Sequence, residues 1–326
     1  MNLQNPKKFK LLIDQAHQVA INVLRPISRK YDKAEHSYPK ELDMLASLVD
    51  GMNEGGEGMN AGAAVGKRGT NEQGNKNGVN LSTALSVIEM CYGDTALLLS
   101  MPRQGLGNSA IAAVANEEQL ERFKNTWAAM AITEPNCGSD SAAIRTSAIK
   151  DGEDYILNGE KIFVTSGDRA DAIVVWATLD KKLGRSAIKS FVIPKGTPGM
   201  TVERLEHKLG IKASDTAVIR LIDCRVPANN LLGNAEIDIA KGFAGVMETF
   251  DNTRPLVAAM AIGCAKASLE RIKEIFSDYL DPQYITPYLQ TTHIASQIYR
   301  MEAEWEAARL LTLKAAWMAD NKKPNS

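Results

Sequence analysis

The chain has 326 residues, which is long enough to bury a sizeable core and to form two or three domains or subdomains. Hydrophobic residues make up 44% of it and charged residues 24%, a composition typical of folded globular proteins rather than disordered ones. The formal net charge of −1 gives no electrostatic reason to expect a nucleic acid or an anionic membrane as a partner.

The first part of the chain has the apolar spacing of amphipathic helices. Apolar residues recur every three or four positions over residues 6–30 and 40–50, with a kink or break expected at Pro26. Residues 51–80 contain nine glycines and six asparagines and predict a long loop. They lack the GxxxxGK[ST] pattern of a phosphate-binding loop. Three more helices are expected: 81–92, 109–115, and one that begins at the capping box Asn116–Gln119.

From residue 129 the apolar period changes from that of a helix to the two-residue period of strands, which predicts a β barrel or sandwich. The dipeptide Asn158-Gly159 predicts a hairpin turn. Helices return after Asn230. The expected strands are 129–133, 146–150, 155–157, 161–165, 172–178, 187–193, 200–204 and 217–223, and the expected helices are 243–279 and 289–318.

The predicted fold class is therefore α+β, in three parts. A helical domain, residues 1–128, precedes a middle β domain, 129–228, and a C-terminal helical domain, 229–326.

Four cysteines lie far apart without a CxxC pair, so neither a metal site nor a disulfide framework is expected. No run approaches the roughly 18 apolar residues of a membrane span. The N-terminus lacks the apolar segment of a secretion signal, so we expect a cytoplasmic protein, or a mitochondrial matrix protein in a eukaryote.

Two short stretches carry the strongest functional signal. In Ala131–Asp140 a strand breaks at Pro135 and Gly138, which predicts a loop rich in free amides and short hydroxyls that suits a flat polar ligand. In Lys161–Gly167 an aromatic residue stands two positions before a threonine, so both face one side of a strand. An ordinary strand and surface turn would also account for each stretch alone.

The order and spacing of these stretches resemble the acyl-CoA dehydrogenase family of flavoproteins. The segment Phe250-Asp-Asn-Thr-Arg-Pro255, followed by an Ala/Gly-rich helix, is similar to the medium-chain members in particular. The resemblance covers about residues 6–320, and Cys137 stands where the family usually has a small Gly, Ser, Ala or Asn.

The resemblance implies FAD as cofactor and an acyl-CoA as substrate, with α,β-dehydrogenation and hydride transfer to flavin N5. It implies an electron-transferring flavoprotein or a similar acceptor as partner, and a homo-oligomer. The residues implied to contact FAD are Met130, Ala131, Ile132, Thr133, Gly138, Ser139, Phe163, Val164 and Thr165, and those implied to contact the substrate are Ser139, Phe250, Asp251 and Arg254.

Two departures from the family pattern affect what we expect of this chain. The medium-chain catalytic glutamate lies in a Tyr-Glu-Gly-Thr-like motif beyond the last predicted helix, and Thr253 stands where other members place a glutamate. We therefore name no catalytic base and expect little or no turnover by residues 1–326 alone. The segment 281–286 also lacks the Arg-Lys pair that holds the FAD pyrophosphate in relatives.

Two alternatives stay open beside the dehydrogenase. The chain could be a non-catalytic or half-site subunit of a hetero-oligomer, in which a partner supplies the base. It could also be an oxidase or monooxygenase on the same fold, because oxygen reactivity depends on access to the flavin.

Overall fold

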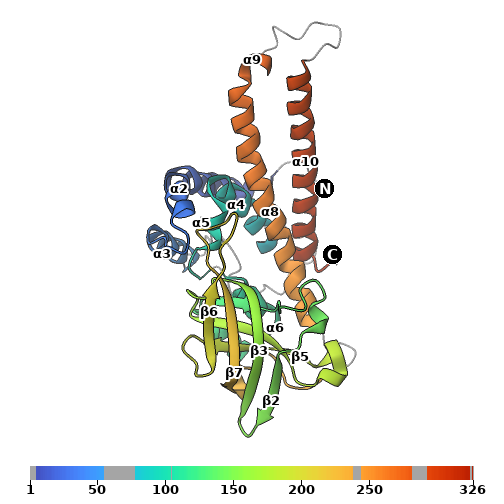
Figure 1. Ribbon diagram of the computed structural model, residues 1–326. Helices are drawn as coiled ribbons and strands as arrows, with labels where there is room; N and C mark the ends of the chain where they lie inside the picture. The colour runs from blue at the N-terminus through green and yellow to red at the C-terminus, as the bar shows by residue number, and fades with distance from the viewer. Residues whose placement is uncertain are drawn as a thin grey trace. The chain divides into compact units, whose positions relative to one another are not determined.

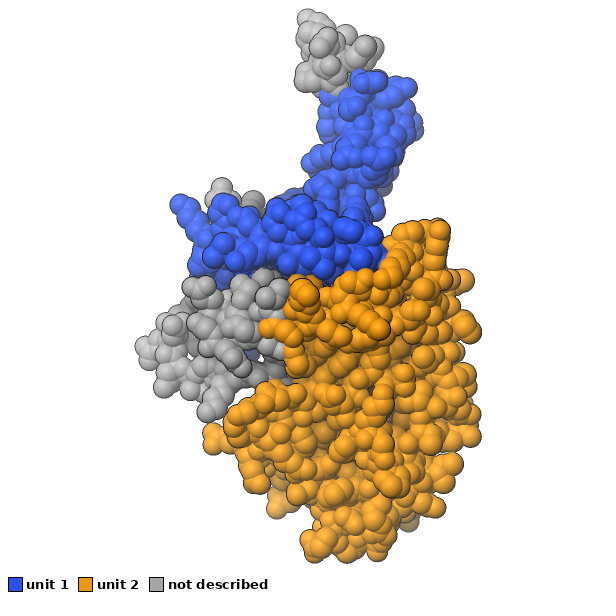
Figure 2. Space-filling model, turned by 90° about the vertical axis from the view of Figure 1, so that its left-hand side faces the viewer, with its two compact units in different colours: residues 1–28, 73–98, 254–326 blue, residues 29–72, 99–253 orange. Residues whose placement is uncertain are grey.

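The computed structural model describes residues 5–54, 78–103, 105–237, 244–280, 292–323 and 325 (Figure 1). Most of the loop predicted for residues 51–80, and the segment 281–286, lie outside the described residues. The chain divides into two compact units, each built from segments distant in sequence (Figure 2). Unit 1 comprises residues 1–28, 73–98 and 254–326, and unit 2 comprises residues 29–72 and 99–253.

Unit 1 is helical. Its elements are η1 (Lys7–Phe9), α1 (Lys10–Val19), the π-helical segment η2 (Ala20–Leu24), α4 (Val79–Gly93), α9 (Ser277–Leu280), α10 (His293–Asp320) and most of α8 (Ala244–Ile275). The helix α4 contacts both α1 and α10, and most of its residues are buried. The helices α8 and α10 run side by side (Figure 1), joined where the Trp305 indole N–H donates to the carbonyl of Ile262 at 3.0 Å.

The helix does not break at Pro26: the π-helical segment η2 continues directly into α2 (Arg25–Lys33), which contains Pro26. The helices α2 and α5 (Thr95–Leu99) each cross from unit 1 to unit 2. Unit 2 also contains α3 (Glu41–Glu54), α6 (Leu106–Val114) and α7 (Glu117–Phe123). The capping box at Asn116 and Gln119 is confirmed. Residues 51–54, predicted as loop, belong instead to α3.

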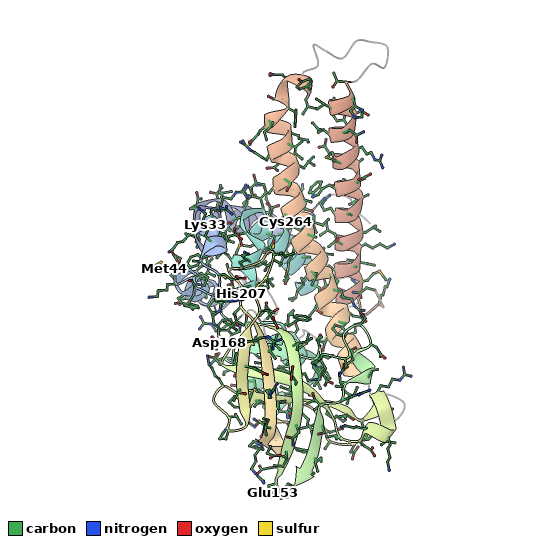
Figure 3. The ribbon with its side chains drawn as sticks, in the orientation of Figure 1. Lys33, Met44, Glu153, Asp168, His207 and Cys264 are labelled. Carbon is green, nitrogen blue, oxygen red and sulfur yellow. The ribbon has the colours of Figure 1, made fainter. Side chains whose placement is uncertain are left out.

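In the described part of unit 2, seven strands form one sheet in the order β1-β4-β2-β3-β7-β6, with β5 paired to β4. They are β1 (Ala128–Ala131), β2 (Ser147–Asp151), β3 (Asp154–Thr165), β4 (Ala172–Thr178), β5 (Ile188–Pro194), β6 (Met200–Leu205) and β7 (Thr216–Pro227). The pairs β1–β4 and β2–β4 are parallel, and the remaining pairs are antiparallel. The β2–β3 turn contains Glu153, which is labelled in Figure 3.

The hairpin predicted at Asn158-Gly159 is wrong. The strand β3 continues through both residues, and the pairing with β7 shifts register between Leu157 and Gly159. The dipeptide thus forms a bulge inside one long strand, because glycine tolerates the local bend without ending the ladder.

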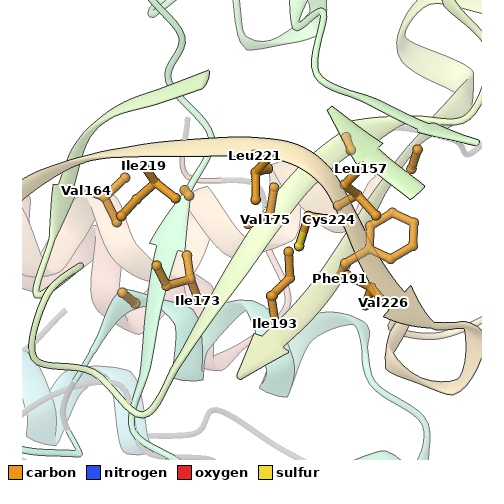
Figure 4. Packing of buried hydrophobic residues seen from close by; sticks show 14 of the residues in the cluster. Leu157, Val164, Ile173, Val175, Phe191, Ile193, Ile219, Leu221, Cys224 and Val226 are labelled. Atoms are coloured by element: carbon orange, nitrogen blue, oxygen red, sulfur yellow. The ribbon is translucent and has the colours of Figure 1, made fainter. Parts of the chain in front are cut away.

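The sheet packs around a core to which β3, β4, β5 and β7 all contribute. Figure 4 shows their buried side chains converging, among them Leu157, Val175, Phe191, Ile193 and Leu221. The strand β4 is buried at every position, which agrees with its uninterrupted apolar run. None of the described helices combines the length and the apolarity required to cross a membrane.

Candidate cofactor and substrate site

The two stretches singled out in the sequence lie next to each other in unit 2. The main-chain N–H of Ile162, on β3, donates to the carbonyl of Thr133, just after β1, at 2.9 Å. The ammonium of Lys161 donates to the carbonyl of Ile132 at 3.1 Å. The strands β1 and β3 are not neighbours in the sheet order, so these bonds hold two separate strand ends together.

We call this contact between the end of β1 and the strand β3 the β1–β3 junction. A buried ion pair also spans it. The side chain of Lys161 is fully buried, and its Nζ lies 2.8 Å from Oε1 of Glu134. The Glu134 carboxylate also accepts the main-chain N–H of Arg145 at 2.7 Å, and both the N–H and the hydroxyl of Thr146 at 2.9 and 2.6 Å. Four donors on one carboxylate fix the loop between Thr133 and Thr146 at both ends.

In the Glu134–Lys161 pair, burial and ion pairing shift the pKa of each group in opposite directions. Burial alone would raise the pKa of Glu134, but the charge and hydrogen bond of Lys161, with the bonds from Thr146 and Arg145, lower it below its ordinary value. Burial lowers the pKa of Lys161, and the attraction of Glu134 opposes that change. The arrangement therefore keeps the carboxylate ionised beside its cation.

A second register shift explains why Lys161 points inward while Phe163 does not. Simple alternation would place these two residues, two positions apart, on the same face. The pairing of β3 with β7 shifts between Lys161 and Val164, and Phe163 has a backbone φ of +58°. The phase of the strand changes there, so Lys161 enters the core and Phe163 faces outward.

The first register shift of β3, at Gly159, also helps to form the β1–β3 junction. A Cβ atom built on Gly159 would lie 2.4 Å from the hydroxyl oxygen of Thr146. Only glycine allows Thr146 to approach β3 this closely, and Thr146 supplies two of the hydrogen bonds to Glu134. The close approach therefore helps to place the Glu134 carboxylate.

The two stretches also contain an exposed aromatic ring and several partly or fully exposed polar residues. The side chain of Phe163 is 61% exposed, and the backbone at Ser166 also has a positive φ, +59°. Thr133 and Thr165 are half-buried, and Ser139 is exposed. The main-chain N–H groups of Gly138 and Ser139 donate to no acceptor among the described residues.

The other predicted FAD contacts differ in what they present. Ala131, Ile132 and Val164 are buried, so their side chains belong to the core and only their main-chain atoms are available to a ligand. The side chain of Met130 is half-buried and packs against a core cluster of α6, β1 and β4. The Cys137 thiol is buried, 3.8 Å from the Glu134 carboxylate, and burial raises its pKa.

The predicted substrate contacts on α8 lie in both units. Phe250 and Asp251 belong to unit 2, where Phe250 is half-buried against the same core cluster as Met130. Thr253, in the position of the family's alternative glutamate, is 5% exposed. Arg254 is exposed and is the first residue of the last segment of unit 1.

Sequence reasoning missed Lys161, Glu134 and Thr146 as parts of the site. A signal was present, because Glu134 ends one strand-forming run directly before Pro135, and Lys161 begins another two positions after Gly159. A charged residue inside such a run is either exposed or paired in the core. The bulge that turns Lys161 inward is not visible in the sequence, so the sequence does not decide between these two cases for Lys161.

Known proteins show similarity over both units. Residues 129–224 match the family model for the acyl-CoA dehydrogenase middle domain, and residues 240–326 match that for the acyl-CoA dehydrogenase C-terminal domain. The chain is 33% identical to cyclohex-1-ene-1-carbonyl-CoA dehydrogenase of Syntrophus aciditrophicus, over 96% of this chain and 72% of that protein.

Solved structures agree with this similarity. Butyryl-CoA dehydrogenase from Megasphaera elsdenii superimposes with a TM-score of 0.79 at 31% identity, covering 99% of this chain and 82% of that one. A chain from the structure of the electron-transferring flavoprotein of Acidaminococcus fermentans superimposes with a TM-score of 0.76 at 30% identity, covering 99% of this chain and 82% of that one. The chain therefore belongs to the acyl-CoA dehydrogenase family, whose members are oxidoreductases that act on CH–CH bonds.

Proposed function

We propose that the chain is the FAD-dependent catalyst of α,β-dehydrogenation of a fatty acyl-CoA thioester. An electron-transferring flavoprotein or a similar acceptor would then reoxidise it. The observation that carries the proposal is the junction of β1 and β3, where a main-chain hydrogen bond joins Ile162 to Thr133 and the neighbouring Phe163 side chain is 61% exposed.

These residues fit an isoalloxazine ring, which is a flat apolar surface with polar atoms along its edge. The ring of Phe163 offers an aromatic packing surface. The hydroxyls of Thr133 and Thr165, and the N–H groups of Gly138 and Ser139, offer hydrogen bonds to the polar edge. When bound, FAD supplies the acceptor for the hydride that leaves the β-carbon of the substrate.

The chain's own task in this proposal is to bind and orient both molecules. The buried Glu134–Lys161 pair holds the two strand ends at a fixed separation, as a preorganised site requires. Ser139, Phe250, Asp251 and Arg254 are the proposed contacts of the CoA thioester. Arg254 is exposed and carries the positive charge that suits a phosphate-bearing ligand.

The substrate class rests on the relatives. Cyclohexene-carbonyl-CoA and butyryl-CoA are the substrates in the names of two similar proteins, so the proposed substrate is a CoA thioester. The test series should therefore include short, medium and cyclic acyl groups.

The first experiment measures flavin binding and thioester-dependent reduction. Purified protein with added FAD should absorb between about 350 and 500 nm, and in the absence of oxygen acyl-CoA should bleach that absorbance only slowly, because no catalytic base is named for residues 1–326. The variant Phe163→Ala should weaken FAD binding by about tenfold, which corresponds to about 1.4 kcal/mol of lost aromatic packing.

A matched control is Ile149→Ala, since Ile149 is 64% exposed on β2 and takes no part in the junction. Its FAD affinity should equal that of the unmodified chain. A protein that takes up no FAD would contradict the proposal. Flavin that binds but is not bleached by any acyl-CoA would favour the non-catalytic subunit instead.

A further inference from the structure

A cluster of two imidazoles and a carboxylate lies in unit 2, away from the β1–β3 junction in sequence. Glu35 and His36 follow α2, and His207, labelled in Figure 3, follows β6. The nearest ligand-type atoms of these three side chains all lie within 4.8 Å of one another. The absence of a CxxC pair argues only against a zinc site made of cysteines. It does not bear on a cluster of histidines and a carboxylate.

Glu35 is already held in place within the cluster. Its Oε2 lies 3.0 Å from Nδ1 of His207, and its Oε1 accepts the main-chain N–H of Lys208 at 2.8 Å. These two contacts fix the carboxylate between the two histidine-bearing segments, and an ionised carboxylate is the form that binds a metal ion.

His36 carries the observation that points to a ligand. Both of its ring nitrogens are buried, and neither has a hydrogen-bond partner among the described residues. Its ring lies 5.1 Å from that of His207, in an edge-to-face arrangement. Buried ring nitrogens without a hydrogen-bond partner cost free energy, whereas a metal ion bound to one of them would compensate for that cost.

The ammonium group of the neighbouring Lys208 does not pair with the Glu35 carboxylate or the His36 ring. Lys208, next to His207, directs its Nζ to the carbonyl of Ser214 and, at 2.8 Å, to the hydroxyl of Thr216.

We propose that Glu35, His36 and His207 bind a divalent transition-metal ion, with zinc as the best match. Two imidazoles and one carboxylate are a donor set typical of zinc, whereas magnesium and calcium prefer oxygen donors alone. Ligands at about 2.0–2.2 Å from a tetrahedral zinc lie about 3.4 Å apart. Oε2 of Glu35 and Nδ1 of His207 lie 3.0 Å apart, and the ligand atoms of all three residues lie within 4.8 Å of one another, so side-chain movements of an ångström or so would bring them to that spacing.

The bound ion would link the turn after α2 to the loop after β6, two segments about 170 residues apart in sequence. Three protein ligands leave a fourth position for water. No redox or hydrolytic step is implied, because the proposed role is to hold two segments together.

The test uses the full chain without an affinity tag, first stripped with a chelator and then desalted. Zinc is titrated in competition with a chromophoric chelator, and cobalt serves as a spectroscopic probe of tetrahedral coordination. We expect one zinc per chain. His36→Ala, His207→Ala and Glu35→Gln should each weaken zinc binding by about tenfold or more.

The matched control is His293→Ala, because His293 is exposed at the start of α10 and lies outside the cluster. It should bind zinc as the unmodified chain does. Zinc should also raise the unfolding temperature of the unmodified chain and of His293→Ala, but not that of His207→Ala.

His207 is an exposed residue, so its variant should fold even if His36→Ala does not. The proposal is wrong if the stripped chain binds no zinc. It is equally wrong if His207→Ala and Glu35→Gln bind zinc as tightly as His293→Ala.

Discussion

At the scale of single residues, the most unusual feature is a lysine with no exposed surface. Removing an ammonium group from water costs several kcal/mol, so lysine is almost never fully buried without a partner. Lys161 satisfies this requirement with Glu134 at 2.8 Å and with the carbonyl of Ile132. A chain with two apolar residues of equal volume at these positions would fold as well. We therefore attribute the Lys161–Glu134 ion pair to positioning of the two strand ends rather than to stability.

The variant Lys161→Met tests this interpretation. It removes one charge and leaves Glu134 buried without its cation, which should lower the free energy of unfolding by about 3–5 kcal/mol. Denaturant titration followed by circular dichroism measures the change. The exposed Lys182→Met serves as the control and should differ by less than about 0.5 kcal/mol.

The double variant Lys161→Met with Glu134→Leu separates positioning from stability. It should recover much of the lost stability, because no buried charge remains unpaired, yet bind FAD more weakly than the unmodified chain. Full recovery of both properties would contradict a positioning role for the pair.

At the scale of elements, local patterns predicted the strand β4 and the capping box of α7 at their observed positions. These local patterns failed where a contact with a residue distant in sequence determines the backbone conformation. Asn158-Gly159 has the preferences of a tight turn, but the approach of Thr146 to Gly159 makes it a bulge within β3. The burial of Lys161 follows from a second bulge of the same kind. The sequence thus singled out the two stretches that the structure brings together, but not the ion pair that joins them.

Another contact between elements predicts a pH effect. Glu41, the first residue of α3, accepts hydrogen bonds from Lys30 at 2.7 Å and from Tyr31, both on α2. These bonds lower its pKa from an ordinary 4.5 to about 2. A lowered pKa in the folded state stabilises the fold above pH 4.5, and that stabilisation is lost as the pH falls from about 4.5 towards 2.

Urea unfolding at a series of pH values tests the sign of this effect. The unmodified chain should lose more stability than Glu41→Gln as the pH falls through that range. Glu153→Gln, in the exposed β2–β3 turn, should follow the unmodified chain. Parallel curves for the unmodified chain and Glu41→Gln would refute the contribution of Glu41.

At the scale of the whole molecule, large apolar side chains remain exposed on the two long helices of unit 1. They include Val257 and Ile275 on α8 and Met301 and Leu311 on α10. Exposed apolar surface of this kind marks a protein interface in many soluble proteins. We therefore keep the proposal that the chain assembles with copies of itself, as a dimer of dimers.

The substitution Leu311→Asp should shift the assembly towards smaller species, because a charge on a covered apolar face must be desolvated. Sedimentation velocity at micromolar concentration measures this shift. Leu209→Asp is the control, since Leu209 is fully exposed in the loop after β6. A monomer in all three samples would remove the case for self-assembly.

In unit 1, the end of the last helix is hydrogen-bonded to a segment about 240 residues earlier in the sequence. The carboxylate of Asp320, the last residue of α10, accepts the main-chain N–H groups of Gly78, Asn80 and Leu81 at the start of α4. A ribosome adds about 5–20 residues per second, so roughly 12–50 s separate the synthesis of α4 from that of Asp320. Through that interval the apolar surface of α4 has no α10 to cover it. During translation, α4 is therefore a segment for chaperones to shield, and unit 2 is free to fold before unit 1 is complete.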